Sequence, residues 1–345
     1  MREFRINLQL FADTSATVAN PNLVQKAWAK QVWEAGKHQS FFEKFMGTNA
    51  QSIVHVKEEL TKTAGDQIFI PLLMPLRDGG VLGDDWLEGN EAALTYREFS
   101  VTINQLRNAV RLVGRFDERK TQIDMRSDAR NALAEWLAHE IDIRIFTALS
   151  TDPTADRVIY GGSATSEATV SDGDRFSVDL IGKAKRLATA DEDTMIRPVR
   201  VDGNEHYVLV IDQWQARDLT NDQRWIDAQQ YANVRGNKNP IFSGALGMYE
   251  GVIIHMTNRV LRTETGATNG NSQTKVGHAL LLGAQACVFA EGEAPRWEEK
   301  TFDYNNKAGF AISRMFGIKK SQFAYNGTDL VDYGVVNILT SSVDD

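Results

Sequence analysis

The pair His139-Glu140 is the first place where this sequence could do chemistry, because it opens the HExxH pattern of zinc proteases. That pattern places two histidines four residues apart, so that both imidazoles face one metal ion. Here Ile143 occupies the second position, and the six histidines of the chain are scattered without a metal-ligand spacing. A catalytic zinc ion takes three protein ligands. We therefore expect His139 to be a helix-surface or interface residue.

Two glycine-containing segments come close to catalytic motifs and miss them. Gly182-Lys183 is followed by Ala184, where a phosphate-binding loop has serine or threonine, and Ser177 stands where its first glycine belongs. Residues 161–165 (GGSAT) resemble a nucleophile elbow without its last glycine. Turns between elements explain these glycines better than substrate binding does.

Acidic residues gather at 172–174 and 191–193, but neither run has the glycine and the final glutamate of a calcium-binding loop. Solvated loop acids are the plainer interpretation. We expect no catalytic residue, no metal and no cofactor, and hence no enzyme. A hydrolase that uses scattered acids is the alternative from another class.

Composition indicates an ordinary globular chain, with 42% hydrophobic and 24% charged residues among 345. The net charge of -8 argues against a protein that coats nucleic acid, because such binding needs clustered Lys and Arg. Any contact with nucleic acid should be weak and indirect. The single cysteine, Cys287, lies in the apolar run 279–290 and is expected to be buried.

No segment approaches the length of a membrane span, so we expect a soluble chain that is cytosolic when made and has no membrane partner. At the N-terminus, Phe4, Ile6, Leu8 and Leu10 alternate with polar residues, unlike the continuous apolar block of a secretory signal. The alternation favours an extended arm that pairs with another segment, with a frayed tail as the alternative.

The first expected elements of secondary structure in the middle of the chain form a two-stranded ribbon. Residues 67–76 are apolar and β-rich, but Pro71 and Pro75 confine them to a sheet edge or an isolated ribbon. The acidic, glycine-rich loop 77–91 follows, and the returning strand alternates at Phe99, Val101 and Ile103. Because an isolated hairpin is marginal in water, this arm needs another subunit to stabilise it.

A long amphipathic helix follows, with Ser127-Asp128 as its expected cap and Ser150 as its expected end. Its apolar stripe is Ala132, Leu133, Trp136, Leu137, Ile141 and Ile145. Shorter helices are expected after Pro21, over 176–190 and over 212–231. Strands are expected over 207–211, 251–256, 297–304 and 309–316, with a turn at 305–307. Helices and strands mix without a regular βαβ order, which indicates an α+β fold.

Several segments, taken in order, resemble tailed-bacteriophage major capsid proteins with the Hong Kong 97-like fold, in the family typified by the coliphage N-four capsid protein. The segment 78–94 (DGGVLGDDWLEGNEAAL) with 96–110 (YREFSVTINQLRNAV) resembles that family's extended loop. The segment 126–150 (RSDARNALAEWLAHEIDIRIFTALS) resembles its spine helix. Further likeness lies in 207–232 (YVLVIDQWQARDLTNDQRWIDAQQYA), 239–261, 280–292 and 303–320 (DYNNKAGFAISRMFGIKK).

The resemblance implies an N-terminal arm and helix (1–65), an extended β-hairpin loop (66–113) and a peripheral domain with the long spine helix (114–195). An axial domain (196–276) and closing strands of the peripheral domain (277–345) would follow. It also implies hexamers and pentamers in an icosahedral shell that encloses phage DNA, with a portal protein at one vertex and possible scaffolding and decoration proteins. No lysine and asparagine pair for covalent cross-linking is identified, and no processed N-terminal extension is expected.

The residues expected to join neighbouring subunits are acids of the loop around one tryptophan and basic groups elsewhere, which the sequence does not pair. They are Asp84, Asp85, Trp86, Glu88 and Glu91 on one side and Arg107, Arg111, Arg126 and Arg130 on the other. An apolar anchor beside charges can set both affinity and register. The alternative function within the same fold is the shell of an encapsulin-like nanocompartment.

Overall fold

The structure is a computed structural model that describes residues 40–61, 65–74, 76, 79–116, 125–201, 203–231, 245–269, 272–324 and 329–343. The expected N-terminal arm and the helix after Pro21 lie outside the described residues, as do Pro75 and Arg77. Within the described part of the chain, no helix is both long and apolar enough to cross a membrane.

A five-stranded sheet is built around one very long hairpin, and its strand order is β1-β2-β15-β16-β5. The hairpin strands are β15 (Cys287–Phe302) and β16 (Lys307–Lys320), flanked by β1 (Met46–Gly47), β2 (Val54–Lys57) and β5 (Asn104–Arg111). The two predicted strands at 297–304 and 309–316 are confirmed, and both extend further than their alternation indicated. Their turn carries three consecutive residues with positive φ, Asp303, Tyr304 and Asn305.

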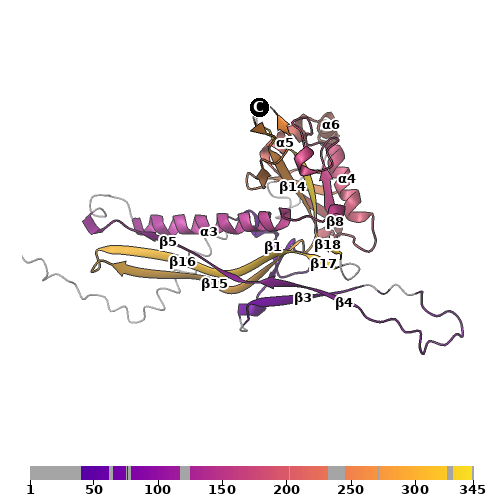
Figure 1. The fold of residues 1–345 in the computed structure, drawn as a ribbon, viewed down its shortest axis with the longest axis horizontal. Helices are drawn as coiled ribbons and strands as arrows, with labels where there is room; N and C mark the ends of the chain where they lie inside the picture. Colours follow the sequence, from indigo (N-terminus) through magenta and orange to yellow (C-terminus); the bar gives the residue numbers. More distant parts are fainter. Residues whose placement is uncertain are drawn as a thin grey trace, which may run out of the picture.

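The long helix α3 (Met125–Ser150) lies along this sheet (Figure 1). Leu133, Leu137, Ile141 and Ile145 are at most 4% exposed, so most of the predicted stripe is confirmed. Two expectations were wrong: the helix already includes Met125 before the expected cap, and Ala132 is exposed. Trp136 is half-buried, at the margin of the same core.

An eight-stranded sheet forms the second layered unit, with the main order β6-β19-β14-β8-β10-β9 and with β11 and β7 at its margins. Its strands are β6 (Val158–Tyr160), β7 (Val199–Val201), β8 (Asn204–Ile211), β9 (Ala245–Tyr249), β10 (Val252–Met256), β11 (Arg262–Thr263), β14 (Val276–Leu282) and β19 (Val335–Ser341). The central strands are buried along their whole length, which explains why they read as continuous apolar runs.

Three helices belong to this second unit: α4 (Val178–Thr189), α5 (Gln213–Asn221) and α6 (Gln223–Tyr231). The single helix predicted over 212–231 was wrong, because the chain breaks at Asp222, whose backbone is extended (ψ 122°). The Asp222 carboxylate accepts hydrogen bonds from the backbone N–H groups of Arg224 (3.0 Å) and Val178 (3.1 Å). One aspartate therefore caps the starts of α6 and α4 together.

The predicted ribbon consists of β3 (Gln67–Leu73) and β4 (Tyr96–Thr102), which pair with each other as a separate two-stranded sheet. Phe99 and Val101 turn inward against Val288, Ala290 and Phe323, so the predicted alternation is confirmed. The remaining short elements are β12 (Thr268–Asn269), β13 (Ser272–Gln273), β17 (Gln322–Ala324), β18 (Leu330–Asp332) and the 3-10 helices η2 (Phe42–Phe45), η3 (Glu59–Thr61), η4 (Ala155–Arg157) and η5 (Glu167–Thr169).

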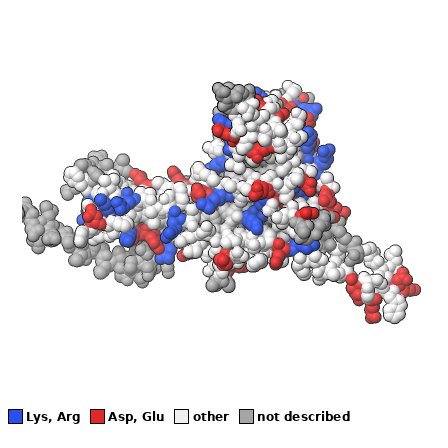
Figure 2. All heavy atoms as spheres, viewed as in Figure 1, with Lys and Arg blue, Asp and Glu red and all other residues white. Residues whose placement is uncertain are grey.

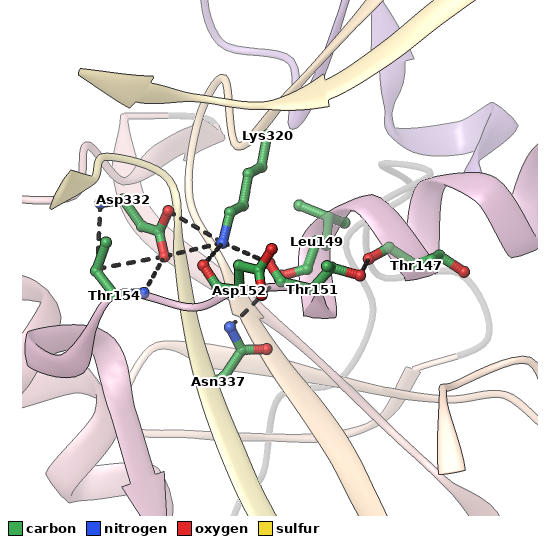
Figure 3. A network of polar contacts seen from close by, with 8 residues as sticks. All are labelled: Thr147, Leu149, Thr151, Asp152, Thr154, Lys320, Asp332 and Asn337. Carbon is green, nitrogen blue, oxygen red and sulfur yellow. Dashed lines mark hydrogen bonds and ion pairs between the residues drawn. The ribbon is translucent and has the colours of Figure 1, made fainter. Parts of the chain in front are cut away.

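A buried polar network where α3 ends joins the end of β16 to the segment after α3 and to β18 (Figure 3). The ammonium group of Lys320, the last residue of β16, donates hydrogen bonds to the carbonyl oxygens of Thr151 (2.7 Å) and Asp152 (2.6 Å) and to Asp332 (3.3 Å). Asp332 also accepts a hydrogen bond from the Thr154 N–H (3.0 Å). The last carbonyls beyond a helix are thus satisfied by a buried cation.

A second buried carboxylate, Asp142 of α3, holds three parts of the chain together and is 0% exposed. It accepts hydrogen bonds from Ser40 Oγ (2.5 Å), Phe41 N (2.7 Å) and Phe42 N (3.4 Å), which places a negative charge at the start of η2. Arg259, which follows β10, forms an ion pair with the same carboxylate. The helix, the N-terminal side of the first sheet and the second sheet meet at this residue.

The sheets do not follow the continuous ranges expected for the domains. The range 277–345 supplies β15 and β16 to the five-stranded sheet but β14 and β19 to the eight-stranded one. The range 114–195 likewise supplies α3 to the first unit, while β6 belongs to the second sheet. The domain boundaries therefore stay a proposal, and the two sheets are the better description of the architecture.

Candidate assembly surface

The loop after β3 leaves the body of the molecule as a long projection (Figure 1). Its described residues from 79 to 95 form no helix or strand. Leu82, Trp86 and Leu87 are 82%, 77% and 62% exposed, although side chains of this size usually bury most of their surface. Exposed apolar groups gathered on one projection mark an interaction surface.

The tip of this projection is a locally closed turn at residues 86–91. The Asn90 side-chain amide donates a hydrogen bond to the carbonyl of Trp86 (2.9 Å), and the Asn90 N–H donates to the carbonyl of Leu87 (3.0 Å). The N–H of Gly89, which has φ 91°, donates to the Glu91 carboxylate (2.8 Å). Glu91, expected only as a charge for a neighbour, therefore also holds its own turn.

The loop acids Asp84, Asp85 and Glu88 are all exposed around Trp86. Figure 2 shows acidic side chains gathered at the end of the projection. Between residues 79 and 91 the sequence has four acids and neither Lys nor Arg. The tip therefore combines an apolar anchor with negative charges that no basic residue of the same segment offsets.

The four candidate arginines lie on the first layered unit. Arg107 and Arg111 are exposed on β5, and Arg111 lies over the ring of Phe302, 5.4 Å from its centroid. Arg126, in the first turn of α3, donates hydrogen bonds to both carboxylate oxygens of Glu299 (2.7 and 2.5 Å). Arg130 is half-buried on the same helix. Arg126 therefore already has a partner within its own chain.

The structure does not bring the loop acids and these arginines together within one chain. The loop projects from one end of the elongated molecule, whereas the start of α3 and the turn between β15 and β16 lie at the other end (Figure 1). A contact between the two sets therefore has to be made between two copies of the chain.

Two further basic residues of this region, Arg296 and Lys300 of β15, were not among the expected site residues. Both are exposed, and Lys300 lies 5.3 Å from the ring centroid of Phe302, beside Arg111. The alternation of charged residues at 296, 298 and 300 could have indicated that they share one face of a strand. In the sheet, β16 lies between β15 and β5 and pairs with both. This arrangement was not visible in the sequence.

A cluster of Glu167, Thr263 and His278 is the nearest approach to catalytic geometry. Thr263 Oγ1 lies 2.6 Å from Glu167 Oε1 and 3.1 Å from His278 Nε2, and Nε2 lies 3.3 Å from the same carboxylate oxygen. A charge relay needs the nucleophile and the carboxylate on different ring nitrogens, and here both meet Nε2. Burial lowers the pKa of His278, which the nearby Glu167 opposes. The cluster ties η5 to β11 and β14.

Other expected chemistry is placed as follows. His139 is exposed on α3, as expected of a surface residue, and Cys287 is fully buried. Burial raises the pKa of the Cys287 thiol to about 12, which removes its nucleophilic form at neutral pH. Among the described residues, no group of three or more His, Cys, Asp or Glu is placed to hold a metal ion.

Comparison with known proteins gives a consistent result. The profile of a family described as phage capsid protein matches residues 16–344. The major capsid protein of Pseudomonas phage KPP25 is 30% identical over 365 residues, which cover 93% of this chain and 96% of that protein. The capsid of Ralstonia phage GP4 is 31% identical with a TM-score of 0.77, covering 88% of this chain and 92% of that one. The Cyanophage Pam1 capsid shares the fold, with 23% identity, a TM-score of 0.74 and coverage of 89% and 93%.

The elongated α+β fold, its projecting arm and these relatives define a structural subunit of a viral shell. The chain belongs to the phage capsid protein family. It is a major capsid protein, and its place is the capsid of the virion.

Proposed function

We propose that this capsid protein assembles into an icosahedral shell of the Hong Kong 97-like type, with hexamers and pentamers that enclose phage DNA. The long helix on a long hairpin, the separate eight-stranded unit and the projecting loop support this subtype, because the resemblance implied the same parts in the same order. The likeness of the segments quoted above supports membership in the group typified by the coliphage N-four capsid protein.

The domain proposal takes the sheets as its guide. We assign the five-stranded sheet with α3 to the peripheral domain and the eight-stranded sheet with α4, α5 and α6 to the axial domain. The ribbon and loop within 66–113 form the extended loop, and β14 and β19 move from the closing strands to the axial domain. Residues 1–65 keep their assignment as the N-terminal arm and helix.

The observation that carries the proposal is the separation of complementary surfaces in one subunit. The exposed Trp86 and the acids of the loop project at one end of the subunit (Figure 2), while the candidate arginines lie on β5 and α3, away from the loop, so each copy can bind the next head to tail. Head-to-tail contacts generate rings when the rotation closes. In such a ring Asp84, Asp85, Glu88 and Glu91 of one copy meet basic groups of the neighbour, with Arg107, Arg111, Arg126 and Arg130 as the candidates.

The other partners follow from the role of a shell. A portal protein at one vertex and scaffolding or decoration proteins are expected partners, and the chain acts as a structural protein and not as an enzyme. The net charge of -8 supports weak contact with the packaged DNA, since a wall that repels phosphates lets the genome enter without adhesion.

An encapsulin-like compartment is the less supported alternative, because the relatives named above are phage capsids. The test is electron microscopy of the protein expressed alone in bacteria, with and without the genes that accompany it in a phage. Closed, uniform shells that take up DNA in the presence of a packaging motor are the expected result. Shells that instead enclose an enzyme would support the alternative, and catalytically active monomers would contradict both.

A further inference from the structure

The face of the five-stranded sheet opposite α3 contains a groove along β16. Residues of β16 that point away from the helix are small in its middle, namely Gly309, Ala311 and Ser313, with Met315 at one end. On both sides the neighbouring strands carry long polar side chains, except at Ala109 of β5, which lies opposite Ala311. The hollow between them has a volume of about 170 Å³.

The walls of this groove follow from the strand register. On β5, Arg107 lies opposite Ser313, and on β15, Arg296 lies opposite the same residue. At the far end the ring of Phe302 covers Gly309, so that a Cβ there would lie 2.8 Å from it. The groove is therefore closed at one end by an aromatic ring and flanked in its middle by two guanidinium groups.

The hollow itself is lined by two arginines, Arg107 and Arg296, and two glutamates, Glu293 and Glu298. Arg111 and Lys300, which lie beside Phe302 at the end of the groove, add two positive charges next to it. Arg296 and Glu298 form an exposed ion pair of 2.9 Å, which contributes little by itself because exposed pairs are weak. A ligand that brings several acids to this groove would therefore be attracted by it.

The turn at 86–91 supplies that ligand in an ordered form. Three hydrogen bonds close it without help from the rest of the subunit, through Asn90 and Glu91. A binding element that is already ordered loses less conformational entropy on association. Its Trp86 and Leu87 are exposed anchors, and Asp84, Asp85 and Glu88 flank them.

We propose that the turn 86–91 of a second copy of this chain seats in the groove along β16, with Trp86 over the small residues and the loop acids against Arg107 and Arg296. This use of the groove as a socket for the turn rests on the proposed head-to-tail assembly, and it names the surface on which the neighbouring loop binds. Arg296 replaces Arg126 as a main partner, because it lines the groove and because its own ion pair, with Glu298, is more exposed (61% and 56%) than the pair of Arg126 with Glu299 (46% and 29%). Asn90 and Glu91 act as positioning residues, since they fix the turn that presents Trp86.

Cysteine cross-linking tests the socket directly, because Cys287, the chain's single natural cysteine, is fully buried and does not compete. Leu87→Cys is combined with Ser313→Cys, and a control combines Leu87→Cys with Gln223→Cys on α6. After assembly and mild oxidation, we expect a ladder of disulfide-linked multimers on a non-reducing gel for the first pair alone. Normal shells from the first pair without a ladder would overturn the socket but leave the proposed assembly role intact.

A charge exchange provides the second test, which does not depend on cysteines. Arg107→Glu with Arg296→Glu should lower the yield of shells by about tenfold or more at a fixed protein concentration. Adding Asp84→Lys and Asp85→Lys should restore most of it. Lys183→Glu with Arg186→Glu on α4 makes the same change of charge on an exposed helix outside the groove and should leave the yield unchanged. Failure of the four-fold variant to recover, with each subunit folded, would overturn the pairing.

The positioning role of Asn90 has its own readout. Asn90→Ala should raise the protein concentration needed for assembly while leaving the melting temperature of the unassembled subunit unchanged, because the turn contacts nothing in its own core. Lower melting temperature with unchanged assembly would show that Asn90 supports the fold and not the contact.

Discussion

The ammonium nitrogen of Lys320 lies 3.3 Å from each carboxylate oxygen of Asp332, and the two side chains are 5% and 0% exposed. Lys320 ends a strand of the first sheet, and Asp332 ends β18 before the last strand of the second sheet. Burial lowers the pKa of Lys320, and Asp332 opposes that effect. The pair therefore fixes the point where the chain passes between the two sheets.

Removing one member of this pair should be costly. Asp332→Ala leaves a buried ammonium group without its counter-charge, and we expect a loss of about 3 to 5 kcal/mol in the free energy of unfolding. The double variant Lys320→Met with Asp332→Leu should lose less than Asp332→Ala, because no buried charge remains. Urea unfolding of the unassembled subunits measures both. A single variant as stable as the parent would contradict the account of the joint.

Two adjacent residues of α3 should respond differently to truncation. Leu137 is 1% exposed within the core between helix and sheets, so Leu137→Ala should cost about 2 to 5 kcal/mol. Trp136 is half-buried, so Trp136→Ala should cost less than the 3 to 5 kcal/mol typical of a core aromatic. Thermal melting of the two variants side by side gives the order, and a larger loss for Trp136 would show that the helix face is misassigned.

That comparison shows what the sequence could predict. Helical spacing identified the apolar stripe of α3. The spacing alone predicted that Ala132 and Trp136 would be as buried as Leu133, because it contains no information on the width of the sheet that faces the helix. The alternation at Phe99 and Val101 identified the ribbon correctly. The break at Asp222 was missed, although an aspartate whose carboxylate accepts a hydrogen bond from the N–H two residues later is a local capping signal. Its second hydrogen bond, from the N–H of Val178, comes from 44 residues away and leaves no local pattern.

The candidate site was predictable in part for the same reason. Loop acids and Trp86 lie together in the sequence, so local composition was enough to select them. The groove depends on the register that places Arg107 and Arg296 opposite Ser313, and these residues come from three distant segments. No local pattern records such a register.

Alkaline pH should destabilise the subunit through two buried groups that lose a proton at high pH, the phenol of Tyr207 and the thiol of Cys287. Burial raises the pKa of Tyr207 from 10.0 to about 12, and its hydroxyl donates a 2.8 Å hydrogen bond to the carbonyl of Ile196. Between these two values the unfolded chain loses its phenolic proton while the folded chain keeps it, so the free energy of unfolding falls as the pH rises.

This contribution is fully present below pH 10 and should amount to about 3 kcal/mol across the window. Cys287, raised from 9.0 to about 12, acts in the same direction from a lower pH. Urea unfolding at a series of pH values from about 8 to about 12, a range that includes the ordinary tyrosine pKa, measures the slope of the free energy of unfolding against pH. Tyr207→Phe should flatten it, and Cys287→Ala should flatten its lower part. An unchanged slope in both variants would contradict the assignment.

The purified protein should bind duplex DNA weakly. With a net charge of -8 and no basic cluster apparent in its sequence, it should have a Kd weaker than about 1 µM near physiological salt. Fluorescence anisotropy at several salt concentrations, on both subunits and shells, checks this. A submicromolar Kd that weakens steeply with salt would show that the wall grips phosphate and would remove the argument from charge.

The most direct test of the central claim, that the loop is an assembly contact and not part of the subunit core, is reversal of its charge. Asp84→Lys, Asp85→Lys and Glu88→Lys are combined in one variant, and circular dichroism and sedimentation are measured on it and on the parent. Glu192→Lys, Asp227→Lys and Glu264→Lys, combined in one variant, change three exposed acids outside the loop and are the control for the same change of charge. The account predicts a triple variant with the parent's spectrum and few or misshapen shells, and normal shells or unfolded monomers would contradict it.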